Sequence, residues 1–168
     1  MKAKLLRVLL LVATVHTLSS CTPESINTVS DTTISSEKKV YNYTYSTAEI
    51  ETMALINNYR VSIGLNELKQ INYISLQSEE HNKYMIANNE VNHDGFVTRS
   101  ENIMKELGAK LVGENVAYNF TTSQAVFNAW ILSPLHKKNI EGKYSDFGIS
   151  IRENDKGQKY YTNIFVQI

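Results

Sequence analysis

Three histidines, His81, His93 and His136, are the residues of this chain most able to do chemistry. Neutral imidazoles bind divalent metal ions, and they also exchange protons near neutral pH. The three lie far apart in the sequence, and no His-Glu-x-x-His pattern places two of them on one helix face. Their spacing alone therefore does not predict that they share a site.

The single cysteine, Cys21, can form no disulfide within the chain. It ends a segment that begins with three basic residues and continues with an apolar run over residues 8–15. This order is typical of a cleavable export signal, since a membrane-spanning helix needs about 20 consecutive apolar residues. The preceding Leu18-Ser19-Ser20 completes a stretch that resembles a bacterial lipobox. We therefore predict a lipoprotein signal peptide over residues 1–20 and acyl chains on Cys21.

Residues 21–45 are rich in Ser, Thr, Asn and charge, which predicts a lipidated N-terminus followed by a flexible tether. Order is expected to begin within the aromatic stretch 41–45. The resulting hypothesis is an exported protein of a bacterial cell envelope. Acyl chains on Cys21 would anchor it to a membrane, and it would face the periplasm or the exterior.

Residues 46–168 carry the signals of one small α+β domain. The predicted helices start at a capping box from Ser46, near residue 73, near residue 100, after Thr122 and at Pro134. Two predicted strands, 147–152 and 160–167, are joined by a turn at 154–157, and residues 111–118 form a strand or a loop. Arg60, in the first helix, is expected to pair with an acid.

Charge and composition limit the partners. The chain has 168 residues, ten of them tyrosines, and 17 basic and 17 acidic residues give a net charge of zero. A balanced charge offers no electrostatic case for nucleic-acid binding. We predict a monomer that binds no nucleic acid.

Five segments, in order, resemble the CAP superfamily (cysteine-rich secretory proteins, antigen 5 and pathogenesis-related proteins), and its short bacterial branch in particular. They are Asn57-Asn58-Tyr59-Arg60; His81 to Met85 with His93-Asp94-Gly95-Phe96; Gly113-Glu114-Asn115; Trp130 to Ile140 with its Ser133-Pro134 and His136; and the closing strands with Phe147-Gly148 and Tyr161 to Phe165. The resemblance implies a three-layer α-β-α sandwich with a small antiparallel sheet.

The resemblance also implies a cleft lined by His93, Glu114 and His136. In several family members the two histidines hold a divalent metal such as zinc, and Glu114 would then be a candidate general base. Many members that are not bacterial carry a second glutamate near the position of Ile131–Pro134, where this chain, like bacterial members commonly, has no acid. That difference weakens a catalytic hypothesis.

Each of these residues also has a structural interpretation. His81 shares a helix face with Ile74 and Met85 and is expected to be a hydrogen-bonded core histidine, while Trp130 is expected to be core. His81 and Trp130 are also candidates for the wall of the cleft. Glu114 could simply accept backbone amides in a loop.

Three functions remain open from the sequence. The first is a binding or scaffold module for an envelope or extracellular ligand, either a lipid or a cell-wall component. The second is a weak metal-dependent hydrolase that uses the His/His/Glu cleft. The third is a purely structural domain for adhesion or spacing.

Overall fold

The structure, a computed structural model, describes residues 39–168. The predicted signal peptide, Cys21 and the predicted tether up to residue 38 lie outside the described residues. The elements in chain order are α1 (Thr47–Ser62), β1 (Lys69–Gln70), α2 (Asn72–Asn88), α3 (Phe96–Leu107), β2 (Leu111–Tyr118), α4 (Ser123–Leu132), α5 (Pro134–Ile140), β3 (Asp146–Glu153) and β4 (Lys159–Gln167).

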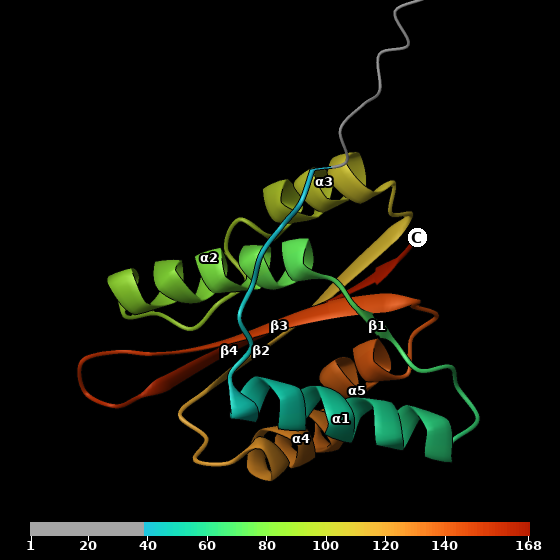
Figure 1. The fold of residues 1–168 in the computed structure, drawn as a ribbon. Helices are drawn as coiled ribbons and strands as arrows, with labels where there is room; N and C mark the ends of the chain where they lie inside the picture. The colour runs from blue at the N-terminus through green and yellow to red at the C-terminus, as the bar shows by residue number, and fades with distance from the viewer. Residues whose placement is uncertain (1–38) are drawn as a thin grey trace, which may run out of the picture. The chain divides into compact units, whose positions relative to one another are not determined.

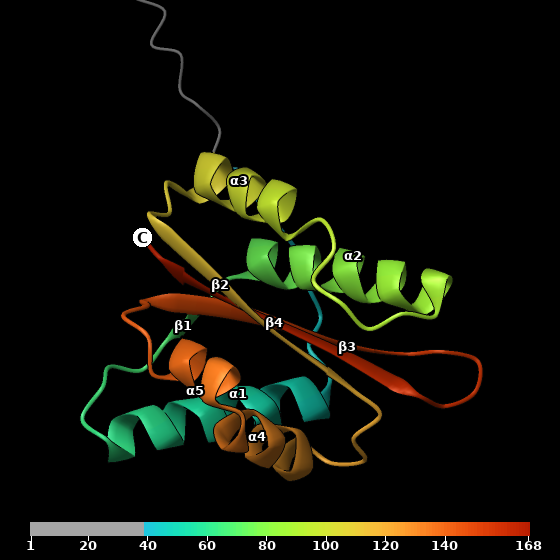
Figure 2. The ribbon, with the colours of Figure 1, turned by 180° about the vertical axis from the view of Figure 1, so that it is seen from behind.

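One sheet with strand order β1-β3-β4-β2 forms the middle layer of the domain. It is antiparallel except for the two-residue strand β1, which pairs with β3 in parallel. Helices α2 and α3 cover one face, and α1, α4 and α5 cover the other (Figures 1 and 2). The α+β class and the three-layer α-β-α sandwich are thus confirmed.

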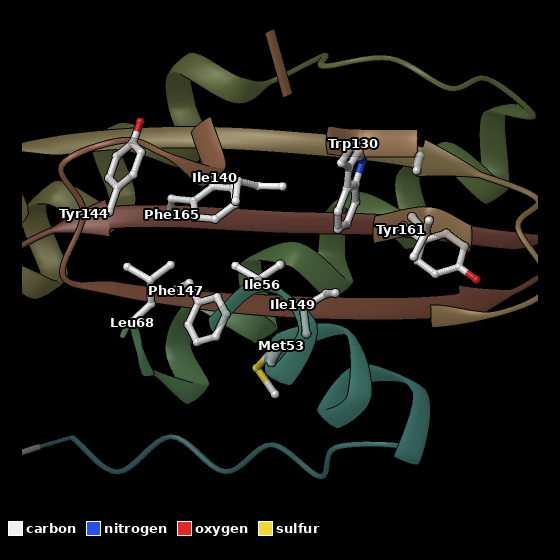
Figure 3. Packing of buried hydrophobic residues seen from close by; sticks show 12 residues of the cluster. Met53, Ile56, Leu68, Trp130, Ile140, Tyr144, Phe147, Ile149, Tyr161 and Phe165 are labelled. Carbon is white, nitrogen blue, oxygen red and sulfur yellow. The ribbon is translucent and has the colours of Figure 1, made fainter. Parts of the chain in front are cut away.

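The central strand β4 places successive side chains on opposite faces of the sheet. Tyr161 and Phe165 pack with Trp130 and Ile56 in the larger core cluster, on the side of α1, α4 and α5 (Figure 3). Ile164, the residue before Phe165, packs on the side of α2 and α3. Each helical layer therefore has its own apolar core against the sheet.

Glycine permits the close approach of α2 to the sheet. A Cβ atom at Gly148 in β3 would lie 2.5 Å from the backbone nitrogen of Ser75, in the first turns of α2. A larger residue would push the helix outward, because backbone atoms cannot rotate away. This contact fixes the height of α2, and with it His81, above the sheet.

The cap of α1 matches the sequence pattern. The Ser46 hydroxyl accepts a hydrogen bond from the backbone N–H of Glu49, and the Glu49 carboxylate accepts one from the backbone N–H of Ser46. The third helix begins at Phe96 rather than near residue 100. Gly95 adopts a φ of 71°, so the chain leaves the preceding turn directly into α3.

Residues 39–45, which we call the strap, run extended along the domain before α1. The Tyr43 hydroxyl donates to the Glu49 carboxylate at 2.7 Å, and the Tyr45 hydroxyl lies 2.8 Å from the Ser75 Oγ atom. Asn72 donates from its side chain to the carbonyl of Tyr41 at 2.9 Å. This last part of the segment predicted as a tether therefore packs on the domain.

Arg60 has no acidic partner within residues 39–168, contrary to the expectation from the sequence. Its fully buried guanidinium donates to the carbonyls of Ile140 at 2.6 Å and Gly142 at 3.0 Å. These carbonyls lie at the end of α5, where the helix leaves acceptors unpaired. The arginine thus binds α5 to α1.

Candidate functional site

The predicted site residues gather around β2, which is an edge strand of the sheet. Successive residues of a strand point to opposite faces. Glu114 therefore faces α2 and α3, while its neighbour Asn115 faces α5. The Gly-Glu-Asn sequence thereby organises both sides of this edge.

The Glu114 carboxylate is buried and fully engaged. Arg99 from α3 donates to it three times: from Nε to Oε2 at 2.9 Å, and from Nη2 to Oε1 at 2.9 Å and Oε2 at 2.7 Å. His93 approaches the same carboxylate through Nδ1, at 2.8 Å from Oε1. The residue is only 6 % exposed, so its charge depends on these partners rather than on water.

His93 lies in the turn between α2 and α3, and its side chain is 52 % exposed. An ionised carboxylate only accepts hydrogen bonds, so Nδ1 of His93 carries the proton that it donates to Glu114. In the neutral ring, Nε2 then keeps its lone pair. Arg99 holds the same turn by donating from Nη1 to the carbonyl of Asp94 at 2.9 Å.

Asn115 holds α5, and hence His136, on the other side of β2. Its side-chain amide donates to the carbonyl of His136 at 3.0 Å, and its oxygen accepts from Asn139 at 2.8 Å. Asn139 also donates to the carbonyl of Glu114 at 3.0 Å. Burial, followed by the nearby charge of His93, lowers the pKa of His136.

Gly113 completes this arrangement because no side chain fits at its position. A Cβ atom there would lie 2.3 Å from the hydroxyl oxygen of Tyr144 and 3.1 Å from the side-chain oxygen of Asn139. The glycine lets the segment that follows α5 close against β2.

Comparison with known proteins decides the family. The sequence model of the cysteine-rich secretory protein family, CAP, matches residues 53–168. The chain belongs to the CAP family.

Similar proteins include bacterial surface and extracellular proteins. An extracellular SCP-domain protein of Bacillus anthracis shares 25% identity with a TM-score of 0.63, over 72% of this chain and 40% of that one. An outer surface protein of Borrelia burgdorferi shares 17% identity with a TM-score of 0.65, over 76% and 98% of the two chains.

A curated relative, the uncharacterized membrane protein YlbC of Bacillus subtilis, is 26% identical over 129 residues. The match takes in 73% of this chain, but it spans only about a third (35%) of the length of that relative. Among residues 39–168 of this CAP protein, no helix is both long and apolar enough to cross a membrane.

His81 lies behind Glu114 in the CAP domain, on α2. It is 2 % exposed, and its Nδ1 lies 3.1 Å from the Thr162 hydroxyl and 3.7 Å from Oε2 of Glu114. Burial lowers the pKa of His81 to about 4, although the charge of Glu114 opposes this shift. The ring is therefore neutral at pH 7.

Trp130 is 1 % exposed and forms part of the core beside β2. Its indole N–H donates to the carbonyl of Val116 at 3.2 Å. The tryptophan thus fixes α4 against the edge strand, two residues along from Glu114.

Arg99 is the functional residue that sequence reasoning missed. It lies at the start of a short predicted helix, and nothing in its neighbourhood distinguishes it from a solvated arginine. The available signal was indirect: a glutamate buried in a strand needs a cationic or hydrogen-bonded partner.

The family resemblance implies a divalent metal, and the β2 edge offers few ligands for it. Within the described range 39–168, no group of three or more His, Cys, Asp or Glu residues is placed to hold a metal ion. Glu114 orients the ring of His93 through Nδ1, in the manner of the carboxylate–histidine pairs behind many metal ligands. That His93 and His136 hold a divalent ion, with Glu114 behind His93, stays a prediction.

Proposed function

We propose that this CAP protein is an exported, lipid-anchored module that binds an envelope or extracellular ligand at the β2 edge without chemical turnover. The observation that carries the proposal is the complete engagement of Glu114 by Arg99 and His93. Such a carboxylate holds groups in place rather than taking protons from a substrate. The extracellular name of the Bacillus anthracis relative supports an exported location.

The alternative function, a metal-dependent hydrolase, requires Glu114 to act as a general base. A general base needs a free lone pair within reach of its proton, and both oxygens of Glu114 face the Arg99 guanidinium. In residues 39–168, the only hydroxyl bonded to a histidine is that of Thr162, which is itself buried and donates to Asn82. Activity would therefore require Glu114 to leave its ion pair.

His93 and His136 would hold a divalent ion if one binds, and the ion would supply positive charge and Lewis acidity at the mouth of the cleft. This chain's own contribution is preorganisation. Glu114 fixes one ring, and Asn115 fixes the helix that carries the other. An ion placed there would attract phosphate or carboxylate groups, which both envelope lipids and cell-wall polymers carry.

The direct test is sedimentation of the domain 39–168 with its two candidate ligands. One set of tubes contains vesicles of bacterial phospholipid, and the other contains purified cell-wall polymer. We expect binding in one set that is lost in the His93→Ala/His136→Ala variant and kept in an exposed control variant, Lys156→Ala. No sedimentation in either set would contradict the proposal.

Calorimetric titration of Zn²⁺ into the same domain separates the metal from the ligand. Binding that disappears in His93→Ala/His136→Ala but persists in His81→Gln would assign the ion to the two-histidine pair. Hydrolysis of an envelope substrate that is lost in both His93→Ala and Glu114→Gln would instead establish the hydrolase.

A further inference from the structure

A groove lined mostly by polar residues lies between α2 and α3. Its volume is about 410 Å³, within the range of small-molecule sites. Figures 1 and 2 show the two helices on the same face of the sheet. The lining residues are Gln77, Glu80, His81 and Tyr84 from α2, and Asp94, Gly95, Thr98, Arg99 and Asn102 from the start and body of α3.

These residues recur at helical spacing on the two facing surfaces, and almost all of them are polar. Helices that pack directly on each other normally present apolar residues along such stripes. Here the buried Ile103 of α3 packs with Ile74 near the start of α2 and with Ile164 of β4, away from the polar stripes. The polar stripes therefore line a space between the helices rather than a contact.

The inner wall of the groove carries a buried acceptor without a protein partner. His81 is 2 % exposed, and no group within residues 39–168 forms a hydrogen bond with its Nε2 atom. Buried polar atoms almost always have a partner, since leaving one unpaired costs the lost hydration of that atom. The Nδ1 atom of the ring faces Thr162 in the sheet. His81 is itself a lining residue of the groove, so a donor bound in the groove is the candidate partner of Nε2.

The hydrogen-bond chain fixes which ring nitrogen carries the proton. The Thr162 hydroxyl gives its own proton to Asn82 Oδ1 at 2.7 Å. It can therefore only accept from His81, whose Nδ1 must be the protonated nitrogen. Nε2 then has a free lone pair, and its hydrogen-bond partner must be an N–H or O–H donor.

The rim of the groove carries negative charge. The exposed carboxylates of Glu80 and Asp94 have no ion-pair partner in the described part of the chain. Their side-chain contacts are hydrogen bonds from neutral groups, such as Gln77 for Glu80 and Tyr84 for Asp94. The positive charge of Arg99 is neutralised by the buried glutamate of β2. The groove therefore favours a cationic donor.

We propose that this α2–α3 groove binds a small organic amine, whose ammonium groups donate to Nε2 of His81 and to the carboxylates of Glu80 and Asp94. A metal ion is the poorer occupant, since these three residues are not close enough to form a metal cluster within residues 39–168. An amine of several atoms can span them. The inference is independent of the proposed function, because it uses neither His93 nor His136 as a ligand.

The test uses putrescine as the probe and 1,4-butanediol, its neutral counterpart of the same length, as the control ligand. The ¹⁵N resonance of His81 Nε2 is followed in the domain 39–168 during each titration. We expect putrescine to move this resonance toward the value of a hydrogen-bonded nitrogen, and butanediol to move it far less.

Two variants locate the binding. Glu80→Gln/Asp94→Asn is expected to weaken putrescine binding about tenfold, whereas Glu101→Gln, the same charge change on an exposed face of α3, should leave it unchanged. Thr98→Lys places an ammonium group in the groove and should block the probe. An unmoved Nε2 resonance at millimolar putrescine would overturn the proposal. Equal responses to the amine and the diol would also overturn it, because they would point to ordinary hydration of His81.

Discussion

The Glu114 carboxylate joins three parts of the domain: its own strand β2, the turn that carries His93 and the helix that carries Arg99. A buried charge of this kind is tolerated only while it is paired. The glutamate of the Gly-Glu-Asn sequence therefore has a structural role in this chain, whatever it does in ligand binding.

Arg99→Met should destabilise the domain by about 3–5 kcal/mol, because it leaves the Glu114 carboxylate buried without its cationic partner. Urea unfolding of the domain 39–168 measures the loss. The double variant Arg99→Met/Glu114→Leu should regain most of it, since no buried charge then remains. A loss below about 1 kcal/mol in the single variant would show that the pair behaves like an exposed salt bridge.

His81 makes the stability of the domain depend on acidity. The pKa of His81 falls from 6.5 to about 4 on folding. Below pH 6.5 the unfolded chain therefore binds a proton at His81 that the folded domain does not bind. Stability should therefore be lost as the pH falls from about 6.5 to 4, by on the order of 3 kcal/mol from this residue. The measurement compares unfolding free energies at pH 7 and pH 4.5. The His81→Gln variant should show a shallower fall, and an identical fall would rule out His81 as its source.

Among the elements, the strap ties the domain to the chain that precedes it. Glu49 is fully buried and accepts from Tyr43 in the strap, from the backbone N–H of Ile151 at 2.7 Å and from Arg152 at 2.9 Å. The Arg152 guanidinium also lies over the Tyr43 ring, 5.4 Å from its centroid. The strap therefore belongs to the cooperative unit, although it contains no helix or strand.

A domain that starts at Ser46 should be less stable than one that starts at Lys39. Tyr43→Phe, which removes one hydrogen bond to a buried charge, should cost about 1.5–3 kcal/mol. The truncation should cost more than this substitution, because it also removes the Tyr45 and Tyr41 contacts. Thermal or urea unfolding of the three proteins gives the order. Equal stability of the two lengths would show that the strap is a passive part of the tether.

The order of the elements could be predicted from local chemistry, and the site could not. Caps at Ser46 and Thr122, Pro134 at a helix start and the 154–157 turn are short-range signals, and the structure has each of them. The strand β1 was missed because two residues paired in parallel with a distant strand leave no pattern of their own.

The grouping of the site residues depends on long-range pairing. Only the register of β2 on β4 and the approach of α3 and α5 bring His93, Glu114 and His136 to one sheet edge. Resemblance to a family supplied that grouping, and spacing in the chain did not. Arg99 and the unpaired Nε2 of His81 emerged only once the burial of each side chain was known.

For the whole molecule, the lipid anchor on Cys21 remains a prediction about residues outside 39–168. In a bacterial host, Cys21→Ala should move the full-length chain from the membrane fraction to the soluble exported fraction, because the acyl chains are its only predicted hold on the bilayer. Labelling with a fatty acid and cell fractionation measure this. Ser19→Ala, a small-residue change at the same site, is the matched control. Membrane retention of the Cys21→Ala chain would contradict the lipid anchor.

The sheet ends in β2 on one side and, beyond the two-residue strand β1, in β3 on the other, and side chains occupy part of each edge. On β2, the carbonyls of Val116 and Glu114 already accept from Trp130 and Asn139. On β3, the N–H of Ile151 already donates to Glu49. A strand from another molecule needs such groups free in order to extend the sheet. These side chains therefore also hinder self-assembly into fibres, so a substitution such as Trp130→Phe endangers solubility even where the fold survives.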